Sequence, residues 1–294
     1  MKFFDFMEEF GDSNTIIQKL RQLSLLRLND ICESCGGEMN ERTRINGDGL
    51  MFFCAKRTCR KAKSIRNGSF FARSKLSLFN IMLFIHLWAK NYPEKIIIDD
   101  FVFSNNTVVD WSRFCRDFCF FHFENDDQII GGLETVVEID ETLVVKRKYN
   151  RGRMLSAGWL FGGIERRTDG AFKCFMRLVY NRSEAHLCHL IREHVAPGTH
   201  IITDGWGAYT NLSTMGYTHS VVVHEENFVN PEDRNINTQK IEATWSSLKR
   251  FIREHGSNKG PHYIEYLYEY IFRRKFDDVF SAIINVIKLE YSLQ

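Results

Sequence analysis

Apolar and polar positions follow two different periods along the chain, and the change of period divides the chain into two parts. Up to about residue 130, apolar residues recur mainly at three- and four-residue steps, which is the spacing of amphipathic helices. From about residue 133, short runs rich in β-branched residues alternate with helical stretches. The pattern therefore predicts a mainly helical first part and an α/β second part.

The first part is expected to contain helices at residues 14–28, 76–90, 96–103 and 107–122. Ser104 or Asn105 is a candidate cap for the last of them. A helix, a short turn and a helix fit a helix-turn-helix, although any helical hairpin has the same pattern. The residues on or near its recognition helix are Thr107, Asp110, Trp111, Arg113 and Arg116, of which Thr107 and Arg113 are the candidate DNA contacts. Cys115 and Cys119 are interpreted as packing residues.

Two cysteine pairs interrupt this part of the chain. Cys32 and Cys35 precede two glycines that suit a tight turn, and Cys54 and Cys59 follow a β-like run. Four thiolates from two turns can surround one Zn²⁺ tetrahedrally, which leaves no open position for a substrate. We therefore expect one structural zinc; the alternative is four unrelated reduced thiols in a reducing compartment.

Basic residues crowd the second cysteine pair. The formal net charge is only +2, so the local clustering is more informative than the total. The cluster suits contacts with phosphates, and the alternative is a solvated basic rim. The candidate DNA contacts are Lys56, Arg57, Arg60 and Lys61, within a wider group that includes Lys63, Arg66 and Arg73.

The run at residues 135–145 has the composition of a strand but carries three carboxylates at its centre. Because side chains alternate between faces, Asp140 shares a face with Glu138 and Thr142, whereas Glu141 points to the other face. A buried carboxylate is costly unless a positive partner, such as a divalent metal, lies beside it. The alternative is an edge strand with a solvated acidic face.

The order of the following elements indicates the fold. We expect strands at 154–165 and 171–179, a helix at 183–195, a strand at 200–203, a helix at 206–215, a strand at 217–223, a helix at 238–253 and two helices within 262–290. Three hairpin-linked strands, then two strands with helices between them, is the order of an RNase H-like domain. In that fold the first strand is central and the fourth lies beside it, so Asp204 would approach Asp140. The alternative for Asp204 is a simple turn residue before Gly205.

The helix at 238–253 supplies a third acid. Ile241, Trp245, Leu248 and Ile252 form its apolar stripe, and Glu242, Trp245 and Lys249 share a face. Three carboxylates from three separate elements suit two Mg²⁺ ions. The alternative is a surface Glu–Lys face.

Three motifs together resemble the Merlin-type DDE transposases and their bacterial insertion-sequence relatives. These are residues 137–142, 202–209 and 241–250, and the ribbon end at 54–71 is similar too. The resemblance covers most of residues 30–275. It implies that Asp140, Asp204 and Glu242 form the catalytic triad and bind two Mg²⁺, for which Mn²⁺ can substitute, with Lys249 as an auxiliary basic residue. Glu138 is a second auxiliary candidate, because it shares the face of Asp140. Many relatives have His where this chain has Asn237.

The resemblance also implies the reaction and the partners. Terminal inverted repeats of double-stranded DNA are bound and cut, and the 3′-hydroxyl ends are joined to target DNA by a homodimer or a larger assembly. The remaining candidate DNA contacts are Lys146, Arg147, Lys148, Arg151, Arg153, Lys249 and Arg250. Trp206 and Trp245 would stack on a base or pack, and packing is favoured. Nuclear localisation is expected in a eukaryotic host, which is favoured, and otherwise the bacterial cytoplasm.

The expected architecture is therefore an α/β, RNase H-like mixed five-stranded sheet with flanking helices at 131–275. An N-terminal helix (1–30), a zinc ribbon (31–75) and a helix-turn-helix region (76–130) precede it, and a C-terminal helix (276–294) follows. No apolar run approaches the ~20 residues of a spanning helix, so no membrane is expected as a partner. The alternatives are a non-enzymatic DNA-binding protein derived from a transposase, an RNase H-like nuclease and, least favoured, a zinc hydrolase.

Overall fold

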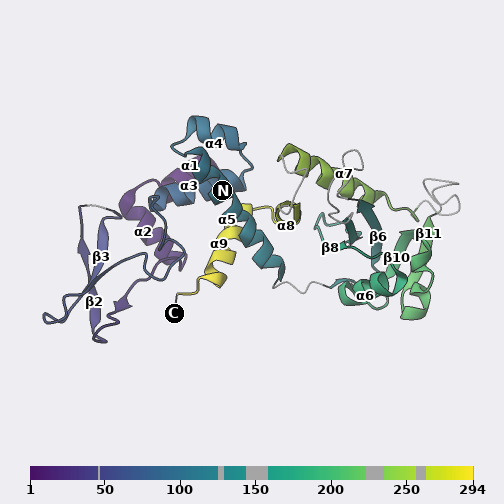
Figure 1. Cartoon of the computed structure of the whole chain (residues 1–294), viewed down its shortest axis with the longest axis horizontal. Coiled ribbons are helices and arrows are strands. Elements are labelled where there is room, and N and C mark those ends of the chain that lie inside the picture. The colour runs from purple at the N-terminus through teal and green to yellow at the C-terminus, as the bar shows by residue number, and fades with distance from the viewer. Residues whose placement is uncertain (46, 125–128, 144–157, 223–234, 256–262, 294) are drawn as a thin grey trace. The chain divides into compact units, whose positions relative to one another are not determined.

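The computed structural model describes the 294-residue chain except for residues 46, 125–128, 144–157, 223–234, 256–262 and 294 (Figure 1). The chain forms two compact units. The first comprises Met1–His122 together with Phe276–Gln294, and the second comprises Phe123–Lys275. The C-terminal segment thus belongs to the same unit as the N-terminal third. None of the described helices is long and apolar enough to cross a membrane.

The first unit is built mainly from helices. These are α1 (Phe3–Phe10), α2 (Ser13–Gln22), α3 (Leu78–Ala89), α4 (Glu94–Asp100), α5 (Asn105–Glu124) and α9 (Val279–Glu290). Helix α3 is buried along most of its length, as its continuous apolar sequence requires. Phe280 of α9 lies with its ring centroid 6.2 Å from that of Phe6 and 6.0 Å from that of Phe10, so the last helix completes the N-terminal core.

One predicted helix of this unit has the wrong length. The expected helix at 14–28 ends at Gln22, and Ser24 has a φ of +58°, which a continuing right-handed helix does not allow. Leu25 and Leu26 are buried although they lie beyond the helix. These two leucines prolonged the apolar pattern past the true end of the helix.

A four-stranded antiparallel sheet carries the cysteines. Its strands are β1 (Asp30–Ile31), β2 (Glu38–Thr43), β3 (Leu50–Cys54) and β4 (Ala62–Ser64), in that order. Each strand pairs with the next in the chain, so the sheet is built from hairpins. The β-like run before Cys54 is confirmed as strand β3.

The second unit contains a mixed five-stranded sheet in the order β11-β10-β6-β7-β8. Its strands are β6 (Val136–Leu143), β7 (Trp159–Glu165), β8 (Cys174–Val179), β10 (His200–Asp204) and β11 (Thr218–Val222). Strands β6, β7 and β8 are antiparallel, whereas β10 is parallel to β6 and to β11. The carboxylate-bearing strand β6 is therefore central, as predicted. Two short strands, β5 (Ile130–Gly131) and β9 (Val195–Ala196), pair separately.

Helices cover both faces of this sheet (Figure 1). Helix α6 (Glu184–His194) packs with Ile139 and Phe161 on one face, and α7 (Gln239–Glu254) and α8 (Tyr263–Lys275) pack with Leu160 and Ile164 on the other. The α/β class with a mixed sheet is thus confirmed. The helix predicted at 206–215 is wrong, because this segment forms two short 3-10 helices, η2 (Gly207–Tyr209) and η3 (Leu212–Met215).

Candidate functional site

Asp140 lies in the middle of the central strand, on the face that α7 covers. The Trp245 indole donates a hydrogen bond of 2.9 Å from Nε1 to Oδ2 of Asp140. Burial raises the pKa of Asp140 to about 7; the charges of Asp204 and Glu141 add to this, and hydrogen bonds from the Glu141 backbone and Trp245 oppose it. A carboxyl group in this state gains from a nearby cation, which would keep it ionised at neutral pH.

Asp204 is the last residue of the neighbouring strand β10 and lies at the level of Asp140. Strand β10 pairs with β6 from His200 opposite Val136 to Ile202 opposite Glu138. Asp204 lies two residues beyond Ile202, as Asp140 lies two beyond Glu138, so the register brings the two acids onto one face of adjacent parallel strands. The backbone N–H of Trp206 donates to Oδ1 of Asp204 over 3.1 Å, which holds this carboxylate at the strand end.

Helix α7 runs along β6, and three hydrogen bonds join the two elements. The Ile241 N–H donates to Oε2 of Glu138 over 2.9 Å, Trp245 donates to Asp140, and Nζ of Lys249 donates to Oγ1 of Thr142 over 2.5 Å. Four helical residues advance about 6 Å and two strand residues about 6.6 Å, so positions four apart on α7 match positions two apart on β6. The predicted face with Trp245 and Lys249 therefore lies on the sheet.

Glu242 follows Ile241 and so lies on α7 between the levels of Glu138 and Asp140. Its side chain is exposed, and Oε1 accepts a hydrogen bond of 2.7 Å from Oγ1 of Thr238. The architecture brings Asp140 and Asp204 together, and it holds the helix that carries Glu242 against the same strand.

Close packing of α7 requires a glycine on the next strand. Gly162 of β7 pairs with Asp140. A Cβ at position 162 would lie 2.8 Å from the ring of Trp245 and 2.7 Å from the Phe175 carbonyl oxygen. Gly162 therefore permits the close approach of Trp245, the tryptophan that contacts Asp140.

Arg166 is a site residue that the sequence did not reveal. Its Nε donates to Oε1 of Glu138 over 2.6 Å, and its Nη atoms donate to the carbonyl oxygens of Asn235 and Asn237. Glu138 is 1% exposed. We name Glu138 and Arg166 together the α7 clamp, because they bind the first turn of α7 and the segment before it to strand β6. Only the strand register could have pointed to Arg166, since it lies diagonally opposite Glu138.

Asn237 has a structural contact in this clamp. Its side-chain oxygen accepts from Arg166 over 3.0 Å and from the Gln239 N–H over 3.3 Å. The residue at the position where many relatives have His thus helps to start α7.

The other face of β6 holds Glu141, as predicted. Its Oε2 accepts a hydrogen bond of 2.6 Å from the Tyr209 hydroxyl, and its Oε1 accepts one of 3.2 Å from Nε of Arg182. Burial raises the pKa of Glu141. The sequence analysis did not identify Tyr209 and Arg182 as partners of Glu141, because neither stands near Glu141 in the chain.

The two tryptophans near the acids differ in exposure. Trp245 packs as expected at 4% exposure, but Trp206 is 46% exposed, so the packing interpretation is wrong for Trp206.

The four predicted zinc ligands form one cluster. The sulfur atoms of Cys32, Cys35, Cys54 and Cys59 all lie within 4.8 Å of one another. Two of the sulfur–sulfur distances are 3.6 Å and 3.4 Å. Tetrahedral Zn²⁺ with Zn–S bonds of about 2.3 Å separates its sulfurs by about 3.8 Å, so the donor set fits zinc.

The basic residues beside this cluster divide into two groups. Arg66 is buried, pairs with Asp48 and donates to the carbonyl oxygens of Ser74 and Leu76, and Lys63 pairs with Asp30 over 2.8 Å. These two side chains stabilise the fold rather than offering a surface for phosphates. The four candidates of the prediction are exposed: Lys56, Arg57, Arg60 and Lys61.

Helix α5 was the predicted recognition helix. The Ser104 hydroxyl accepts from the Thr107 N–H over 3.2 Å, which confirms Ser104 as the cap. Trp111 and Arg116 are buried, so these two expected recognition residues lie in the core, whereas Arg113 is exposed. Cys115 and Cys119 are buried, as predicted for packing residues. A groove of about 1020 Å³ beside α5 is lined by acidic, basic and aromatic residues, including Asp110, Arg73 and Phe114.

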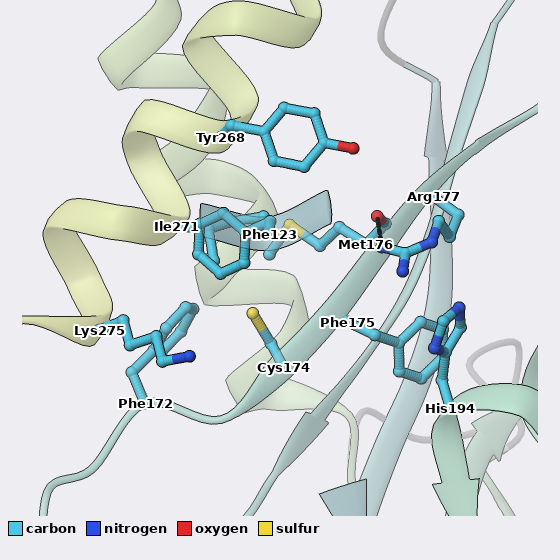
Figure 2. A pocket seen from close by; sticks show the side chains of 10 residues that line it. All are labelled: Phe123, Phe172, Cys174, Phe175, Met176, Arg177, His194, Tyr268, Ile271 and Lys275. Carbon is cyan, nitrogen blue, oxygen red and sulfur yellow. Dashed lines mark hydrogen bonds between the residues drawn. The ribbon is translucent and has the colours of Figure 1, made fainter. Parts of the chain in front are cut away.

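Two further features are separate from the acidic site. The small cavity in Figure 2, between β8 and α8 residues such as Cys174 and Tyr268, measures about 30 Å³, which holds only one or two water molecules. Among the described residues, none of the three acids lines it. The predicted DNA contacts Lys146, Arg147, Lys148, Arg151 and Arg153 lie outside the described residues.

Together, these features define an α/β protein whose mixed sheet presents a pair of aspartates on adjacent parallel strands beneath a helix that bears a glutamate. Residues 130–275, which fall within the second unit, match the family model of the ISXO2-like transposase domain. The match identifies a DDE transposase domain of insertion-sequence type in residues 130–275, which confirms the resemblance of the motifs in that region. This family implies DNA as the partner and divalent metal use. No curated protein matches the chain.

Proposed function

We propose that the chain is an active DDE transposase with an RNase H-like catalytic domain. It binds terminal inverted repeats, cleaves DNA and joins the 3′-hydroxyl ends to target DNA by in-line phosphoryl transfer. The observation that carries the proposal is the shared level of Asp140 and Asp204 on adjacent parallel strands. Burial raises the pKa of Asp140, and the negative charge of Asp204 raises it further, because two neighbouring carboxylates disfavour each other's ionised form.

Asp140, Asp204 and Glu242 would hold two Mg²⁺, with Mn²⁺ as a substitute. Carboxylate oxygens are the ligands that these ions prefer. When bound, the ions supply activation of the attacking water or hydroxyl and stabilisation of the leaving oxygen. Trp245 fixes the orientation of Asp140 through its indole N–H. Lys249 lies one level further along β6, at Thr142, where its ammonium group and the nearby Arg250 would contact DNA phosphates.

The first unit would bind DNA sequence and hold a structural Zn²⁺. Four thiols form its zinc site, and exposed Lys56, Arg57, Arg60 and Lys61 stand beside it. Thr107 and Arg113 remain the proposed contacts of a helix-turn-helix. Because two transposon ends must be held at once, we propose a homodimer or a larger assembly on DNA.

A cleavage assay with DNA that carries the inverted repeats flanking the gene tests this function. We expect Mg²⁺-dependent cutting by the wild type and none above background by Asp140→Asn, Asp204→Asn or Glu242→Gln. Glu193→Gln is the matched control, since Glu193 is also an exposed glutamate on a helix of the same unit. Tight repeat binding without cutting in Mg²⁺ or Mn²⁺ would instead identify a non-enzymatic DNA-binding protein, and equal cleavage of RNA–DNA hybrids that lack the repeats would identify a nuclease.

A further inference from the structure

Trp206 is an exposed aromatic residue at the edge of the acidic site. It lies two residues after Asp204, and its backbone N–H donates to the Asp204 carboxylate. Among the described tryptophans it is the most exposed, at 46%. A Cβ added to either neighbour, Gly205 or Gly207, would meet no atom within 4 Å apart from its chain neighbours, so the backbone on both sides of Trp206 is not closely packed. A lone exposed tryptophan would need no explanation, but this one is rigidly supported.

Arg182 provides that support. Its guanidinium carbon lies 4.6 Å from the centroid of the Trp206 ring and 3.9 Å from that of Trp159, both of which are cation–π distances. The same guanidinium donates to Glu141, which is 8% exposed and also accepts from Tyr209. Because Glu141 follows Asp140 on β6, the indole is tied through Arg182 to the strand that carries the first acid. A ring held in this way loses little conformational entropy when a ligand stacks on it.

The chemistry of the ligand follows from the ring and its place. An indole offers a flat π-face, and the flat π-face that DNA can bring to an acidic metal site is a nucleobase. In a duplex, neighbouring base pairs cover both faces of each base, so only an unpaired or unstacked base can use such a platform. We propose that Trp206, supported by Arg182, is a stacking platform for an unpaired base. This base would lie beside the phosphate that reacts at Asp140 and Asp204. This proposal rests on the proposed function.

Binding of a labelled oligothymidylate to the full chain, measured by fluorescence anisotropy in Mg²⁺-free buffer without chelator, tests the platform. Trp206→Leu keeps an apolar side chain but removes the π-face, and we expect it to weaken binding by between about 5-fold and 150-fold. Trp206→Phe should bind within a few-fold of the wild type. Tyr180→Ala, which removes another exposed aromatic side chain of the same unit, should bind like the wild type. Thermal unfolding of each variant confirms that it folds.

A second readout separates stacking from mere packing. If the platform exists, oligothymidylate quenches tryptophan fluorescence in the wild type and in Tyr180→Ala, and quenching is lost in Trp206→Phe although binding persists. Equal binding by the Leu and Phe variants, or unchanged quenching in Trp206→Phe, overturns the proposal. Cleavage by the wild type together with such a result would leave the transposase function intact. Stacking at Trp206 in a chain that never cuts DNA would refute the proposed function alone.

Discussion

The α7 clamp should control how firmly the third acid is held. Arg166→Met removes the cation that pairs with Oε1 of Glu138 and leaves that carboxylate, 1% exposed, with only the Ile241 N–H as its hydrogen-bonded partner among the described contacts. Loss of one partner from a buried ion pair costs about 3–5 kcal/mol. The Arg166 side chain is 25% exposed and solvent screens part of the interaction, so we expect a cost at or below the bottom of that range, about 2–3 kcal/mol.

The cost should fall on the start of α7 rather than on the whole unit. Because the Ile241 N–H donates to Glu138, the first turn of the helix should open more often in the variant. A loss of about 2 kcal/mol corresponds to roughly 30-fold faster amide hydrogen exchange where exchange follows local opening. Mass spectrometry of peptides covering 238–248 measures this rate. A higher Mg²⁺ requirement for cleavage should accompany it, since Glu242 is carried by the same turn.

The matched control is Arg167→Met. Arg167 stands next in the chain but pairs with the carboxylates of Glu165 and Asp169, neither of which belongs to α7 or to the segment before it. Its removal should leave exchange in 238–248 unchanged. The double variant Glu138→Gln/Arg166→Met removes the orphaned charge and should be more stable than the sum of the two single changes predicts. Unchanged exchange and an unchanged Mg²⁺ requirement in Arg166→Met would refute the role of the clamp.

Two further predictions concern metal and proton binding. Purified protein should contain one Zn²⁺ per chain, and either Cys54→Ser or a chelator should lower the zinc content and unfold the first unit. The circular dichroism spectrum of the isolated 123–275 segment should not change when the chelator is added. A zinc-free chain that keeps its folded ribbon would contradict this prediction. In Mg²⁺-free buffer, the pKa of Asp140 is raised to about 7 in the folded protein, above its value of about 4 in the unfolded chain. Protonated Asp140 therefore stabilises the folded state at low pH, and this stabilisation is lost as the pH rises from about 4 through 7. Asp140→Asn should therefore flatten the fall in melting temperature over this range, and an equally steep fall in the variant would contradict the assignment.

The sequence was most informative where a periodic pattern and a chemical anomaly coincided. Alternation placed Asp140 and Glu138 on one face and Glu141 on the other, and the structure has the same arrangement. The strand order predicted that Asp204 would lie beside Asp140, because the fourth strand of such an order pairs with the first. The four cysteines were equally informative, because two close pairs in two turns are typical of a tetrahedral zinc site.

The sequence was least informative where contacts depend on register. Arg166 meets Glu138, and Arg182 meets Glu141, only because of how separate strands and loops align, and no local pattern marks either pair. The segment after Asp204 was misread for a different reason. Trp206, Tyr209, Leu212 and Met215 recur at strict three-residue steps, which is the period of a 3-10 helix rather than of an α-helix.

The central claim is that Asp140 and Asp204 jointly hold divalent metal for DNA cleavage. Isothermal titration calorimetry with Mn²⁺ tests this claim most directly. The full chain is measured in parallel as the wild type, Asp140→Asn, Asp204→Asn and Glu193→Gln. We predict that both aspartate variants lose the tightest binding event and cut repeat DNA slower by a factor on the order of 10³ or more, whereas Glu193→Gln retains both properties. Unchanged Mn²⁺ binding in either aspartate variant would contradict the account.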